Sequence, residues 1–149
     1  MSFDVFFQPC RFGCITEGEQ SNEPLTAVEE QAVRNLLAHA CPSGPDEHHC
    51  WVVQVGDGGS AEVFGKDLSA ACMFALHDFT PDLVQLMFDL LVAGNWVMLP
   101  AQDGPGAIAA SVDALRGVPD GFPEVAICGS ADALGVLLGG GSQKPNPKR

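Results

Sequence analysis

Apolar and polar residues follow two repeats along this chain, one of two residues and one of three to four. The first repeat is typical of strands with one buried face, and the second is typical of helices with one buried face. The opening segment SFDVFFQ shows the two-residue repeat and is predicted to be a strand. One face of this strand is expected to carry Phe3, Val5 and Phe7, and the other Ser2, Asp4, Phe6 and Gln8.

The same repeats divide the rest of the chain into predicted strands and helices. Further strands are expected at residues 49–55, 61–64, 70–77, 95–101 and 124–128. Helices are expected at residues 26–40, 80–94, 107–116 and 130–138. The strand at 70–77 is apolar on both faces, so we expect it inside the sheet and covered on both sides. The helix at 107–116 is expected to present Ile108, Val112 and Leu115 on one face.

Turn and capping residues delimit several of these elements. Thr26 and the glutamate three residues later predict a capping box. Thr80 followed by Pro81 predicts a second helix start, and Gly94 predicts its end. Ser130 is expected to cap the last helix. The glycine-rich run at 56–60 is predicted to be the turn of a hairpin rather than a phosphate-binding loop.

The order of these elements predicts an α+β fold. We expect one globular domain over residues 1–141, a sandwich in which helices pack on a mixed, largely antiparallel sheet of about five to six strands. Residues 9–24 are expected to form a solvated loop, which is long enough to be functional. Residues 142–149 are expected to form a disordered tail.

The charge of the chain narrows the choice of partner. The 149 residues include 19 Asp and Glu against 7 Lys and Arg, which gives a net charge of −12. Such a surface repels phosphate groups, so a nucleic acid or an anionic membrane is not expected as a partner. A basic protein is the partner that fits this charge.

The start of the chain carries no pattern of a secretory signal, so a cytoplasmic location is expected. The six cysteines are accordingly interpreted as free thiols. The most apolar segment, at 83–100, contains Asp89 and the pair Gly94 and Asn95, which favour a buried helix and strand over a membrane span. The opening MSFDVFF is similar to the start of some short bacterial proteins, and this likeness implies no chemistry.

No sequence motif identifies a catalytic site or a cofactor, and none is expected. Lys66 follows a glycine but precedes Asp67, where a phosphate-binding loop needs Ser or Thr. Cys72 and His77 are expected on opposite faces of one strand, so they cannot act as a nucleophile and its base. His77 and Asp78 follow the end of that strand, and they are the candidate catalytic residues of an alternative function, an enzyme or small-ligand binder with a pocket at the strand ends.

The segment CPSGPDEHHCW offers candidate metal ligands. His48 and Cys50 are expected to share one face of a strand, and Cys41 could fold back toward them across the turn. Thiolate and imidazole groups suit zinc, but their spacing is unlike that of known zinc modules. Cys10 and Cys14 would supply one half of such a site. A zinc-stabilised module is therefore a second alternative.

The function that the sequence favours is that of a small acidic cytoplasmic protein that binds another protein. One version of this hypothesis is an immunity-like or antitoxin-like protein that neutralises a basic partner, because opposite charges favour fast and selective association.

Overall fold

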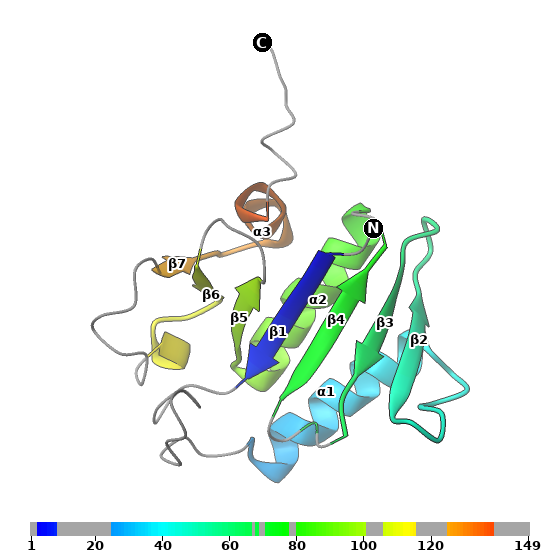
Figure 1. Ribbon diagram of the computed structural model, residues 1–149. Coiled ribbons are helices and arrows are strands. Elements are labelled where there is room, and N and C mark those ends of the chain that lie inside the picture. Colours follow the sequence, from blue (N-terminus) through cyan, green and yellow to red (C-terminus); the bar gives the residue numbers. More distant parts are fainter. Residues whose placement is uncertain are drawn as a thin grey trace.

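The structure is a computed structural model, and it describes residues 3–8, 25–66, 68, 71–77, 80–100, 106–115 and 125–138. It contains seven strands, three α-helices and one 3-10 helix in these ranges (Figure 1). The strands are β1 Phe3–Gln8, β2 Cys50–Gln54, β3 Ser60–Phe64, β4 Cys72–Leu76, β5 Val97–Pro100, β6 Ala107–Ala109 and β7 Val125–Ile127. The helices are α1 Ala27–Ala40, α2 Pro81–Gly94, the 3-10 helix η1 Asp113–Leu115, and α3 Ala131–Leu137.

All seven strands form one sheet in the order β2-β3-β4-β1-β5-β6-β7. Every neighbouring pair is antiparallel except β6 and β7, which are parallel. The first strand of the chain therefore lies at the centre of the sheet, between β4 and β5. The predicted α+β class with a mixed sheet is confirmed, and the strand count of five to six is too low.

Helices α1 and α2 lie on one face of the sheet (Figure 1). The side chains between the two layers are buried, as expected for Val5 and Phe7 in β1. The Phe7 ring contacts the rings of Phe74 and Trp96, with centroids 5.2 Å and 5.4 Å apart. Burial of these apolar groups is the main source of stability in a domain of this size.

The predicted caps at the starts of α1 and α2 are both present. The Glu29 N–H donates to the Thr26 hydroxyl at 3.1 Å, and the Thr26 N–H donates to the Glu29 carboxylate at 3.0 Å. The Thr80 hydroxyl accepts the Leu83 N–H at 3.2 Å. These bonds satisfy N–H groups that have no partner within a helix. The hairpin of β2 and β3 and the Ser130 cap of α3 are confirmed as well.

Helix α2 ends at Gly94 as predicted, and the left-handed residue that follows it is Asn95, with φ 50°. Gly94 is required for another reason, because a Cβ there would lie 3.0 Å from the Trp96 ring and 3.2 Å from Val33. The glycine thus allows α1, α2 and the start of β5 to approach one another closely.

The helix predicted at 107–116 is wrong. Residues 107–109 form β6, and a short 3-10 helix follows at 113–115. Ile108 pairs with Met98 of β5 and is buried, while Ala107 and Ala109 pack on the other face with Val97 and Ala114. Alanine favours a helix locally, but pairing with β5 and burial in a narrow space outweigh that preference.

β4 lies inside the sheet as predicted, between β3 and β1, but its cover on the second face is incomplete. Cys72, Phe74 and Leu76 are buried under the helices, whereas on the opposite face Ala75 is buried and Met73 is partly exposed. None of the described helices has both the length and the apolar character that a membrane crossing requires. The loop at 9–24 and the tail at 142–149 lie outside the described residues, and the single domain over 1–141 stays a prediction.

Candidate functional site

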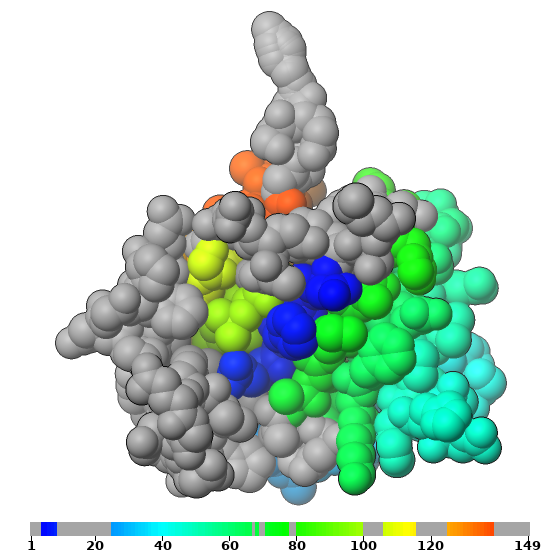
Figure 2. Space-filling view, viewed as in Figure 1, coloured from blue at the N-terminus to red at the C-terminus, as the bar shows by residue number. Residues whose placement is uncertain are grey.

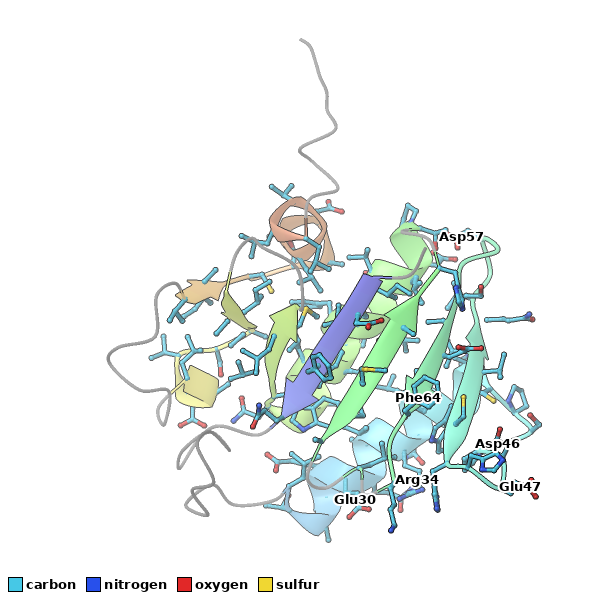
Figure 3. The ribbon with its side chains drawn as sticks, viewed as in Figure 1. Glu30, Arg34, Asp46, Glu47, Asp57 and Phe64 are labelled. Atoms are coloured by element: carbon cyan, nitrogen blue, oxygen red, sulfur yellow. The ribbon has the colours of Figure 1, made fainter. Side chains whose placement is uncertain are left out.

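The sheet register aligns five apolar side chains across five strands on the face opposite α1 and α2. Cys50 pairs with Phe64, Phe64 with Met73, Met73 with Phe6, and Phe6 with Leu99. Directly paired residues lie on the same face, so these side chains form a continuous line, which we call the apolar row. Phe6 is 43% exposed and Phe64 is 39% exposed. Phe64 is labelled in Figure 3.

A hollow with a volume of about 690 Å³ opens beside the apolar row. Phe6, Phe64, Met73 and Leu99 line it, and Gln8 and Lys66 contribute polar groups. Figure 2 shows this face of the molecule, with β1 and β4 near its centre. The lining is therefore mostly apolar, as in sites that receive an apolar group from another molecule.

Carboxylates follow the apolar row on one side. Glu62 lies two positions before Phe64 in β3, and Asp4 lies two positions before Phe6 in β1. Both residues pair with Ala75 of β4. We call Glu62 and Asp4 the acidic flank. Lys66 lies beyond the other side of the row, because it follows Phe64 by two residues. The charges on this face are thus separated by a band of apolar side chains.

The basic side chains of the described residues are few. Apart from histidines, they are Arg34 and Lys66. The Arg34 guanidinium contacts the Glu30 carboxylate at 3.1 Å on the surface of α1. Carboxylates outnumber these cations throughout the described part of the chain, so its surface is acidic.

The candidate catalytic pair is only partly described. His77 follows β4, its side chain is 50% exposed, and its Nε2 lies 3.9 Å from the Glu62 carboxylate. Asp78 lies outside the described residues. Complete burial raises the pKa of the Cys72 thiol, so this thiol is a poor nucleophile. The hollow beside the apolar row lies at the start of β4, whereas His77 follows its end.

The structure does not bring Cys41, His48 and Cys50 together as metal ligands. In the described ranges, no group of three or more His, Cys, Asp or Glu side chains is arranged to hold a metal ion. The Cys41 thiol is buried and donates to the Gly44 carbonyl oxygen at 3.5 Å. His48 precedes β2 and is 78% exposed, with its Nε2 3.4 Å from the Glu47 carboxylate. Cys10 and Cys14 lie outside the described residues.

Asp46 organises this segment instead. Its carboxylate accepts the N–H groups of Cys50 at 3.0 Å and of His48 at 2.7 Å, and these two bonds lower its pKa. The Asp46 N–H also donates to the Cys50 carbonyl oxygen at 3.0 Å. Since β2 is an edge strand, Asp46 occupies both backbone groups that Cys50 would otherwise present to a further strand. Asp46 and Asp57 lie at opposite ends of β2 (Figure 3).

Asp57 connects the hairpin turn to α2. Its carboxylate accepts the N–H of Asp82, in the first turn of α2, at 3.0 Å, and the N–H of Gly59 at 3.2 Å. The bond from Asp82 is the largest cause of the lowered pKa of Asp57. Gly59 lies against Thr80, so that a Cβ at this position would collide with the threonine side chain. The turn is therefore fixed against the start of the helix.

The sequence interpretation missed the apolar row, although one signal of it was present. Phe6 is a large apolar residue on the strand face that otherwise carries Ser2, Asp4 and Gln8. A single exposed aromatic residue is common on protein surfaces, and only a contiguous apolar patch indicates a contact surface, so this residue alone did not identify the site. Phe64 likewise shares a strand face with the polar residue Glu62, but its position beside Met73 depends on the strand order.

The chain matches no model of a known protein family, no curated protein and no solved structure in the comparisons made. The fold and the site thus define a class only: an α+β domain whose mixed sheet carries α1 and α2 on one face and an apolar row on the other.

Proposed function

We propose that this protein binds another protein through the apolar row and that the partner is basic. The observation that carries the proposal is the line of partly exposed side chains that includes Phe6, Met73 and Phe64 on the face opposite α1 and α2. Exposed contiguous apolar groups are costly in water and mark interaction sites. An immunity-like or antitoxin-like neutralisation of a basic protein is the version that the charge of the chain favours.

The acidic character of the chain supports a basic partner. A net charge of −12 attracts a protein of opposite charge over a distance and repels nucleic acid. The acidic flank places carboxylates next to the apolar row, where a lysine or arginine of the partner could pair with them. The proposal places this binding in the cytoplasm, where the six cysteines remain thiols.

A capture experiment tests this proposal. The immobilised full chain is exposed to a lysate of the source cells, in parallel with a Phe6→Ser/Phe64→Ser variant. The control is Val28→Ser/Val136→Ser, which removes two exposed apolar side chains from α1 and α3. We expect the wild type and the control, but not the face variant, to retain a basic protein that about 0.5 M salt releases. Equal capture by the face variant, or capture that salt does not weaken, would contradict the proposal.

A further inference from the structure

The face opposite α1 and α2 offers side chains and no backbone hydrogen bonds. The N–H and C=O groups of its strands point to neighbouring strands within the sheet. An extended segment lying on this face would have its own backbone groups shielded from water without partners, which is costly. An α-helix pairs these groups internally, so it can lie on an apolar face without that cost.

The edges of the sheet leave little room for an extended segment. At one edge, Asp46 already occupies the N–H and C=O of Cys50, which leaves the outward groups of Val52 and Gln54 in β2. At the other edge, β7 has three residues. A partner strand could therefore pair over only a few residues at either edge, whereas the apolar row crosses five strands.

The length of the apolar row fits a short helix. The row runs from β2 through β3, β4 and β1 to β5, which is four strand spacings of about 4.8 Å, or about 19 Å in total. At a rise of 1.5 Å per residue, a helix of about 13 residues has this length. Such a helix would contact the row with apolar side chains at every third or fourth position.

The charges beside the row determine which flank of this helix should be basic. Glu62 and Asp4 lie about 7 Å from the row, because each is two positions along its strand from Phe64 or Phe6. That offset matches the distance from the apolar stripe of a helix to its flank, given a diameter of about 10 Å. Lysine or arginine on this flank would meet the two carboxylates. Lys66, on the far side of the row, favours an acidic residue on the opposite flank.

We propose that the partner segment is a basic amphipathic α-helix of about 13 residues that lies along the apolar row, with its cationic flank over Glu62 and Asp4. This inference rests on the proposed function and names the partner class for the same surface. A second copy of this chain is a poor occupant, because each copy carries a net charge of −12.

Three fluorescent peptides of about 14 residues test the inference with the full chain. The first has leucines at helical spacing with lysines along one flank, the second has glutamates in place of the lysines, and the third is the lysine peptide with a central proline. Fluorescence anisotropy measures each dissociation constant. We expect the lysine helix to bind, and the proline peptide and the glutamate peptide to bind at least about tenfold more weakly.

Variants of the chain locate the peptide. Phe6→Ser/Phe64→Ser should weaken binding of the lysine helix by about tenfold or more, whereas Val28→Ser/Val136→Ser should not. Glu62→Gln leaves the apolar row intact and so gives a second measurement if the double variant fails to fold. It should weaken binding more than Asp132→Asn, which removes the same charge from α3.

The outcomes separate this inference from the proposed function. Equal binding of the proline peptide, or equal effects of Glu62→Gln and Asp132→Asn, would overturn the helix proposal. Failure of the lysine helix to bind would overturn it as well, and the proposed function would still stand if protein capture from lysate depended on Phe6 and Phe64. A dimer in sedimentation that Phe6→Ser/Phe64→Ser abolishes would overturn it in favour of a second copy. Equal capture of a basic protein by the wild type and by Phe6→Ser/Phe64→Ser would overturn the proposed function itself.

Discussion

The carboxylate of Asp57, in the turn between β2 and β3, accepts the backbone N–H of Asp82 in the first turn of α2 at 3.0 Å. The two residues are 25 positions apart in the chain. A carboxylate at a helix N-terminus pairs with an otherwise unsatisfied N–H and interacts favourably with the helix dipole. This bond fixes the hairpin to the helix, and it thereby fixes one end of the strand that carries Phe64.

Replacement of Asp57 by asparagine should lower thermal stability in a pH-dependent way. The pKa of Asp57 is lowered in the folded protein, so its stabilising effect is complete above about pH 4 and is lost as the pH falls through that lowered value. We expect Asp57→Asn to lower the Tm by a few degrees at pH 7 and by less near pH 3. Glu47→Gln, in an exposed loop, is the control. An unchanged Tm at pH 7 would contradict the role of this bond.

Replacement of two helical glycines by alanine should change the free energy of unfolding in opposite directions. Gly94→Ala places a Cβ 3.0 Å from the Trp96 ring and 3.2 Å from Val33, so we expect a loss of about 1–3 kcal/mol in the free energy of unfolding. Gly135→Ala in α3 meets only Val84, at 3.8 Å, and should gain about 0.5–1 kcal/mol from helix propensity. Urea denaturation of the two variants measures both values. A gain for Gly94→Ala would contradict the close packing of α1 on α2.

Local patterns in the sequence predicted the features whose structure depends on residues that are close together in the chain. The capping box at Thr26, the Thr80 cap and the hairpin turn at 56–59 involve residues within a few positions of one another. Their geometry follows from side-chain chemistry that is independent of the rest of the fold. The structure has all three where the sequence predicted them.

Features that depend on distant contacts were not predictable in the same way. The alanines at 107–109 have helical propensity, and only pairing with β5 makes them a strand. The apolar row requires β1 to lie between β4 and β5, which no local pattern specifies. The segment around Asp46 was interpreted through its cysteines and histidines, although the aspartate is the residue that organises it.

Loss of the Asp46 carboxylate should expose backbone N–H groups at and next to the start of β2 to solvent. Asp46→Ala removes the acceptor of the Cys50 and His48 N–H groups, so we expect their hydrogen exchange to accelerate by between about twofold and tenfold. Glu47→Ala, one residue further along, should leave these rates unchanged. Exchange measured by mass spectrometry or NMR at these two amides tests this expectation. Equal rates in the wild type and Asp46→Ala would show that the carboxylate does not protect the edge.

Oxidative footprinting of the complex shows whether the partner covers the apolar row. Hydroxyl radicals label exposed aromatic and methionine side chains, and the labelling of Phe6, Phe64 and Met73 can be compared with and without the basic protein that the chain captures. We expect the partner to reduce labelling of all three residues, while exposed side chains away from this face, including Val28 on α1, are labelled as before. Unchanged labelling of Phe6 and Phe64 in the saturated complex would contradict binding through the apolar row.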